Sequence, residues 1–194
     1  MSTTLSNRGQ VRRDAVLEIA RDLLVEEGFD QFVLRRVAAK ADMKLGNLQY
    51  YFATRDDLLE AVIRAEFDRD LDALRRATTV ESAEGLKTAA RALVRNWTTG
   101  AGSVFGTMSL LAYHHDRFRE LNREIYATFY RELSVLIRQV SPGVPKAEAA
   151  ARARLVTAVL DGVAMQIHAG VIGKRELTSR AADLVVTIAQ GRPG

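Results

Sequence analysis

Proline is confined to the last third of this chain, and that restricts its fold more than any other feature. The 194 residues contain only Pro142, Pro145 and Pro193. The first 141 residues therefore carry no residue that must break a helix. Apolar residues recur at steps of three and four, and no segment shows sustained two-residue alternation. We predict an all-α fold.

The apolar spacing divides the chain into helices of different lengths. A first helix is expected to end at Gly28, and two short helices joined by a tight turn follow up to Phe52. A long helix starts at Thr54, where Thr54 and Asp57 form a capping-box pattern in which Asp replaces the usual Glu. The glycine-dense segment over 98–106 is expected to break or kink the chain. Further helices are predicted over 86–97, 107–113, 118–140, 146–169 and 181–188.

Composition narrows the class of protein. With 47% hydrophobic and 27% charged residues the chain can bury a core, and its length fits two compact units. We place a three-helix helix-turn-helix domain over 1–53 and a larger helical bundle over 54–194. The absence of cysteine excludes disulfides, thiolate catalysis and cysteine zinc sites. The uncharged stretch over 96–115 is too polar to span a bilayer, and the first residues lack a signal-peptide core, so we expect a cytoplasmic protein.

Net charge alone does not identify a nucleic-acid partner. The chain carries a formal charge of +4, but residues 1–60 hold nine basic and ten acidic side chains, a net charge of −1. The argument for DNA therefore depends on where polar groups are placed.

The two short helices ending at Phe52 have helix-turn-helix proportions, and the second is short enough for a DNA major groove. Tight helix pairs also occur in ordinary bundles, so the spacing alone leaves both interpretations open. Residue types favour DNA, because the second helix offers Lys44, Asn47 and Gln49 near its start. Amide side chains can pair with base edges, and basic side chains with guanine or phosphate.

Several stretches resemble one family of regulators. These are Gly28-Phe29, RRVAAKA over 35–41, LGNLQYYF over 45–52 and TRDDLL over 54–59. Together they are similar to the DNA-binding domain of the TetR family, over roughly residues 8 to 60. The resemblance implies a homodimer whose amino-terminal domains read a palindromic operator. It also implies a larger helical domain that binds a small-molecule effector and releases the DNA, usually as a repressor.

The resemblance assigns positions to the DNA contact. The recognition helix would run from about Leu45 to Tyr51, and Arg55, where the family commonly has lysine, would touch phosphate. Arg8, Arg12 and Arg13 are open to two interpretations, as an arm along the DNA or as solvated charges. The complete predicted DNA-binding set is Arg35, Arg36, Lys44, Leu45, Gly46, Asn47, Gln49, Tyr50, Tyr51 and Arg55.

Four positions depart from the family pattern. Asp42 stands where glycine is usual, and Lys44 where a small hydroxyl residue is usual, so the turn and the helix cap should differ here. Aspartate tolerates a left-handed turn better than most residues. Phe32 replaces a common hydroxyl residue, and Gln49 a common tyrosine, whose role Tyr50 could share. We expect the geometry to be kept and individual contacts to change.

The stretch LDGVA over 160–164 resembles the carboxy-terminal domain of BetI-like members, which pairs two subunits. It lies in a helix whose apolar residues occupy nearly every side, which predicts burial on all sides. One seam of this helix holds mostly small residues that permit close approach of another helix. An intramolecular central helix is the alternative. The predicted dimer interface is Leu155, Ala158, Gly162, Met165, Leu184 and Ile188.

A small-molecule pocket is expected among the middle helices. Aromatic residues at helical spacing are also ordinary core material, so each candidate has a second interpretation. Tyr126 and Tyr130, four residues apart and each with a hydroxyl, are the stronger candidates. An aromatic box for a quaternary ammonium has no further support in the sequence. The predicted ligand-binding set is Trp97, Phe105, Met108, Tyr113, Phe118, Tyr126 and Tyr130.

Catalytic and cofactor motifs are not found. The sequence has no P-loop, dinucleotide fingerprint, zincin motif or nucleophile elbow, so we predict no cofactor and no enzyme activity. His114-His115-Asp116 is interpreted as a solvated helix end, because adjacent residues on a helix point apart and share no metal without ligands from elsewhere. Two alternatives to a regulator stay open: a helical ligand-binding protein whose first domain is only structural, and a small helical enzyme that uses the histidines.

Overall fold

The computed structural model describes residues 7–77, 82–170 and 173–191, and this part of the chain contains helices and no strand. The all-α prediction is confirmed. The elements are α1 (Asn7–Glu27), η1 (Phe29–Gln31), α2 (Leu34–Lys40), α3 (Leu45–Tyr51), α4 (Arg55–Ala77), α5 (Ala83–Trp97), α6 (Gly100–Ala112), α7 (Asp116–Val140), α8 (Lys146–His168) and α9 (Lys174–Gln190).

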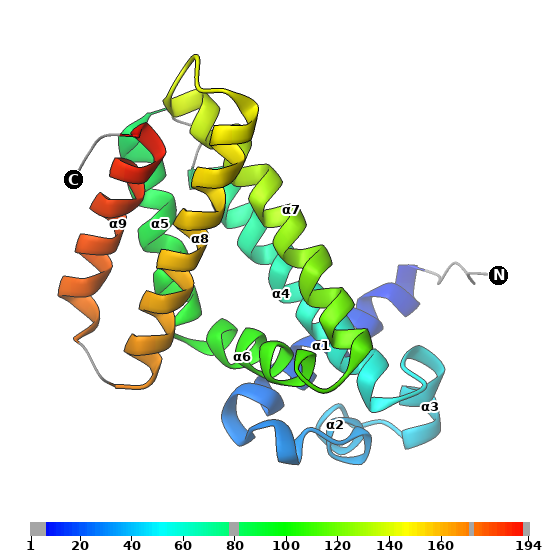
Figure 1. The fold of residues 1–194 in the computed structure, drawn as a ribbon. Helices are drawn as coiled ribbons and strands as arrows, with labels where there is room; N and C mark the ends of the chain where they lie inside the picture. The colour runs from blue at the N-terminus through cyan, green and yellow to red at the C-terminus, as the bar shows by residue number, and fades with distance from the viewer. Residues whose placement is uncertain (1–6, 78–81, 171–172, 192–194) are drawn as a thin grey trace.

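The helices form two regions that share α4. Helices α1, α2 and α3 gather at one end of the molecule, and α5, α8 and α9 stand side by side at the other (Figure 1). Helix α4 packs on α1 and also on α5 and α7, while α6 crosses between the regions and contacts both α1 and α7. Buried apolar side chains from Val16 to Ala189 form one continuous core. No helix within the described ranges is long and apolar enough to cross a membrane.

Two residues with positive φ shape the turns of the first region. Helix α1 ends where Gly28 adopts φ 82°, and its N–H donates to the Leu24 carbonyl at 3.1 Å. Asp42 adopts φ 48° between α2 and α3, at the position where the sequence predicts a left-handed turn. Only a few side chains other than glycine tolerate this backbone, aspartate among them. Helix α3 has the bounds Leu45–Tyr51 that the sequence analysis predicts for the second short helix.

The capping box predicted at the start of α4 is confirmed. The Thr54 N–H donates to Asp57 Oδ2 at 3.0 Å, and the Asp57 N–H donates to Thr54 Oγ1 at 3.1 Å. Arg117 on α7 donates to Asp57 Oδ1 at 2.7 Å. This guanidinium, with Thr54, holds the pKa of the Asp57 carboxyl below its usual value. The first turn of α4 is therefore fixed both to its own cap and to α7.

The expected break over 98–106 is wrong in position. Helix α6 begins at Gly100 and continues through the glycines to Ala112, so only Thr98 and Thr99 separate it from α5. A Cβ at Gly102 would lie 1.9 Å from the Trp97 carbonyl oxygen. Here glycine allows a close approach between successive helices and does not end a helix.

Candidate DNA-binding surface and ligand cavity

Helix α3 presents one polar face to solvent. Leu48 is fully buried and anchors the helix, whereas Asn47 and Gln49 are exposed and Tyr50 is 69% exposed. Lys44 occupies the N-cap in an extended conformation, and its side chain makes no capping hydrogen bond, in line with the predicted departure from the family. The amides and the tyrosine hydroxyl are thus free to meet an external partner.

Basic residues of α1 lie beside this face. Arg8 and Arg12 line the same hollow as Asn47, Tyr50 and Tyr51. Guanidinium groups next to amide and phenol donors suit a polyanion backbone on one side and base edges on the other. Both arginines belong to helix α1, a position that fits residues flanking the DNA backbone, and their contact with DNA stays a prediction.

Some of the other predicted DNA-binding residues are exposed, and others are bound to residues of the same chain. Arg35 is exposed, and Gly46 has open space where a Cβ would stand. Arg36 forms an ion pair with Glu27, which also pairs with Lys40 at 2.9 Å. Both cations lower the pKa of the Glu27 carboxyl. Leu45 is half-buried.

Arg55 has a structural role that the sequence did not reveal. Its guanidinium carbon lies 3.8 Å from the centre of the Phe29 ring, and Nη2 donates to the Phe29 carbonyl at 2.6 Å. The side chain therefore fastens the start of α4 to the segment after α1. The phosphate contact implied by the family stays a prediction, and only the N–H groups not used by Phe29 are available for it.

A cavity of about 470 Å³ lies between α4, α5, α6, α7 and α8. Five of the predicted ligand residues line it: Trp97, Phe105, Met108, Tyr113 and Tyr126. Phe118 does not, because it is buried near the start of α7 with its ring edge-on to His115. Tyr130 is also outside the lining and packs its ring on Tyr126 at 5.7 Å.

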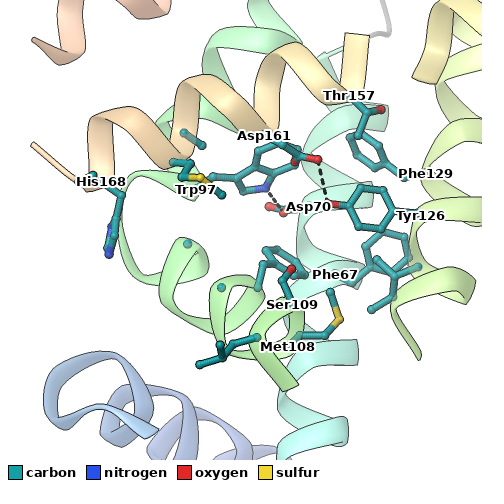
Figure 2. A pocket seen from close by; sticks show the side chains of 18 of the residues that line it. Phe67, Asp70, Trp97, Met108, Ser109, Tyr126, Phe129, Thr157, Asp161 and His168 are labelled. Atoms are coloured by element: carbon teal, nitrogen blue, oxygen red, sulfur yellow. Dashed lines mark hydrogen bonds between the residues drawn. The ribbon is translucent and has the colours of Figure 1, made fainter. Parts of the chain in front are cut away.

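Two carboxylates that the sequence analysis did not select complete the cavity. Asp70 on α4 is 1% exposed and accepts hydrogen bonds from Asn96 Nδ2 at 2.6 Å and Trp97 Nε1 at 2.5 Å. Asp161 on α8 accepts from the Tyr126 hydroxyl at 2.8 Å (Figure 2). Burial raises the pKa of Asp70 to about 6 and also raises the pKa of Asp161.

A sequence signal for Asp70 exists. It lies three residues after Phe67 and four before Leu74, so it interrupts the apolar stripe of α4 with a charge. A carboxylate on the buried face of a helix is costly and therefore informative. Asp161 sits inside the LDGVA stretch, which the sequence analysis attributed to dimerisation alone. His114 and His115 are exposed between α6 and α7, at the helix end predicted for them.

Helices α8 and α9 expose an apolar surface, which we call the α8–α9 face and define by the six predicted interface residues. Leu155 is 58% exposed, Met165 71% and Leu184 46%. Val156 and Leu160, on the opposite side of α8, are buried. Within a single chain one seam of α8 faces solvent, so burial of this helix on all sides requires a second copy on that seam and stays a prediction.

A helix-turn-helix with a polar, exposed second helix, followed by a helical domain around a cavity, is the architecture of a DNA-binding regulator. Comparisons with known proteins agree. The family model "Bacterial regulatory proteins, tetR family" matches residues 16–62, and the model "BetI-type transcriptional repressor, C-terminal" matches residues 83–189. The chain belongs to the TetR family of transcriptional regulators. The family consists of regulators, which confirms the prediction that this chain is not an enzyme.

Individual relatives agree with this assignment. The chain is 28% identical over 150 residues to an HTH-type transcriptional regulator in the dhlA 5′ region of Xanthobacter autotrophicus, covering 73% of this chain and 74% of that protein. A TetR-family regulator from Rhodococcus sp. superposes with a TM-score of 0.79 at 18% identity, covering 93% and 99% of the two chains. A regulator from Saccharomonospora viridis in complex with choline gives 0.75 at 20% identity, covering 91% and 96%.

Proposed function

We propose that this regulator is a homodimeric repressor, that α3 of each protomer reads one half of a two-fold symmetric operator, and that a small molecule in the cavity releases the DNA. Two recognition helices can enter successive major grooves only at a separation of about 34 to 36 Å or a suitable multiple. A ligand that changes this separation weakens the operator complex.

The observation that carries the proposal is the position of α4. Its first turn follows directly on the recognition helix and is held by the Thr54–Asp57 capping box. Its middle contributes Phe67 and Asp70 to the cavity. One rigid helix therefore touches both the cavity and the base of the DNA-binding region. A ligand acts on DNA affinity to the extent that it binds the two arrangements of α4 unequally.

Helix α6 provides a second contact between the two regions. Met108 and Phe105 line the cavity, and the same helix packs on α1. A ligand that displaces α6 would therefore also act on α1, whose Arg8 and Arg12 lie beside the recognition helix.

The α8–α9 face supports the dimer. Three large apolar side chains on adjacent helices, between 46% and 71% exposed, form a surface that water disfavours. Small residues next to them, Ala158 and Gly162, leave room for the partner's helices to approach. Two copies of α8 and α9 would then form a four-helix interface.

The small-molecule effector is supported by the cavity and by one structural neighbour. A cavity of this volume, lined mostly by apolar and aromatic groups with a few polar ones, is typical of ligand sites. The Saccharomonospora viridis regulator, which shares the fold, binds choline in its complex. We infer that the corresponding helical region of this chain also takes a small molecule.

The test is nuclease protection of DNA that flanks the protein's own gene, at about 150 mM salt with excess random competitor, where nonspecific attraction is weak. We expect a two-fold symmetric footprint at nanomolar protein. If flanking DNA gives none, selection from random DNA follows with the same protein. Failure of both to yield a symmetric site would overturn the proposal.

A further inference from the structure

The cavity has an unbalanced set of ionisable groups. Among the described residues, its lining includes the carboxylates of Asp70 and Asp161 and no lysine or arginine. The other titratable lining groups are the phenols Tyr113 and Tyr126 and the imidazole of His168. His168 is exposed and lies at the opposite end of the cavity from Tyr126 (Figure 2). The interior of the cavity is therefore acidic.

Neither carboxylate is paired with a cation among the described residues. Asp70 is held by Asn96 and Trp97, and Asp161 by Tyr126, all through neutral donors. Glu66 lies one turn before Asp70 and is buried as well, at 2% exposure, but it does have cationic partners. It is paired with Arg21 Nε at 2.5 Å and Arg69 Nη1 at 2.8 Å. Helix α4 thus pairs Glu66, which lies outside the cavity lining, with two arginines. Asp70, which lines the cavity, has no such partner among the described residues.

This arrangement is costly for the empty protein. A buried carboxylate without a counter-charge loses hydration that neutral hydrogen bonds replace only in part. A ligand that carries a positive charge would restore the missing interaction. A neutral ligand would leave the cost in place, and an anionic one would add repulsion.

The cavity walls offer aromatic and small residues that can contact the uncharged part of such a ligand. The Trp97 ring centre lies 5.8 Å from that of Phe129 and 6.5 Å from that of Phe105, so three aromatic rings stand together on one side. Aromatic faces attract cations when water is excluded. Small residues, including Gly106 and Ala164, leave space for an apolar group of moderate size.

We propose that the cavity binds an organic monocation, a protonated or quaternary amine on an apolar body, with Asp70 and Asp161 as its counter-charges. This inference names the chemical class of the effector and in that sense rests on the proposed function. Binding itself requires neither DNA nor a dimer.

The test is isothermal titration of the full-length protein at neutral pH with two matched pairs of probes. Benzyltrimethylammonium is compared with its uncharged carbon isostere, neopentylbenzene, and protonated phenylbutylamine with phenylbutanol. We expect at least one cation to bind about tenfold or more tightly than its neutral partner. Equal affinity within both pairs, or no saturable binding by either cation, would overturn the inference.

Substitutions of the two carboxylates test whether Asp70 and Asp161 bind the cation. Asp70→Asn and Asp161→Asn should each weaken the preferred cation by about tenfold and change the neutral partner by less than about twofold. Asp161→Glu should retain the preference because the charge is kept. Asp68→Asn, which removes an exposed charge from the same helix as Asp70, is the matched control and should leave both affinities unchanged. Circular dichroism on each variant verifies the fold. Cation affinity that survives both Asn variants would contradict the assignment.

A separate assay distinguishes the two proposals. The operator complex is challenged with the preferred cation and with its neutral partner. If the cation binds in calorimetry but leaves the complex intact, the cation site stands and the effector role fails. If the cation gives no saturable binding in calorimetry and only the neutral partner releases DNA, the regulator stands and the cation site fails.

Discussion

At the scale of single residues, the DNA-binding region contains exposed polar side chains that are available to DNA and side chains that are engaged within the protein. Asn47 is exposed on α3 and adjoins Arg12 across the hollow that both line. Arg55, by contrast, is fixed on Phe29 and supports the start of α4. The resemblance to the family assigned both residues to DNA, and only their surroundings separate the two roles.

Asn47→Ala should cost about 1 to 3 kcal/mol at the operator and relax specificity at one base pair, because an amide that pairs with a base edge is lost. Binding titrations on the operator and its single-base variants measure this. Arg35→Ala is the matched comparison: it should weaken binding to all sequences alike and make the salt slope shallower by about one. Unchanged base preference in the Asn47 variant would remove Asn47 from the readout.

Asp70 should make stability depend on pH. Its pKa is raised from its ordinary value near 3.8 to about 6 by burial, so the folded state holds the proton more tightly than the unfolded chain. The resulting stability is fully present below about pH 4 and is lost as the pH rises towards 6, by about 3 kcal/mol. Asp161, whose pKa is also raised, adds to the trend with the same sign.

Asp70→Asn isolates that contribution, since an amide does not titrate. Chemical denaturation between about pH 4 and 7 should show the variant gaining on the parent as the pH rises to about 6, with no further change above it. A constant difference across this range would mean that Asp70 is not buried as an acid.

At the scale of elements, local signals predicted most helix ends, because caps and turns depend on neighbouring residues. The Gly28 end, the Asp42 turn and the Thr54–Asp57 box all involve residues no more than four positions apart. The start of α6 could not be predicted in this way. Its Gly102 allows the close contact with the Trp97 carbonyl, and such a contact depends on how two helices are placed in space.

Thr54→Ala should destabilise the protein by about 1 kcal/mol, because the Asp57 N–H loses its acceptor at the start of α4. Denaturant unfolding checks the value. Thr88→Ala, an exposed threonine within α5, is the control and should be neutral or slightly stabilising, since alanine is the better helix former. Equal effects of the two substitutions would show that the capping box adds nothing to stability.

At the scale of the whole molecule, the described helices share a continuous core beside the ligand cavity and leave the α8–α9 face uncovered. Gly162 lies on this face, and a Cβ there would meet nothing within 4 Å inside the chain. A side chain at this position therefore begins in open space within a single protomer, which makes Gly162 a suitable position for testing the proposed dimer.

Gly162→Leu should convert the proposed dimer to monomers by overfilling the seam between the helices of two protomers. Light scattering measures the mass, and operator affinity should fall in parallel. Ala127→Leu adds a similar side chain at an exposed position of α7 and should leave the mass unchanged. A dimer that survives the Gly162 change would place the interface elsewhere.

The sequence by itself determined the helical class, the short recognition helix and its polar face. These follow from proline placement, apolar periodicity and turn residues, which act over a few positions. It also selected five of the aromatic and apolar residues that line the cavity. The tertiary structure alone decided that Asp70 and Asp161 reach the same cavity, 91 positions apart in the chain. It likewise decided that Arg55 stacks on Phe29. Such contacts depend on how helices distant in the sequence pack together. The helical period of apolar residues predicts which side of a helix is buried, but not which residues that side contacts.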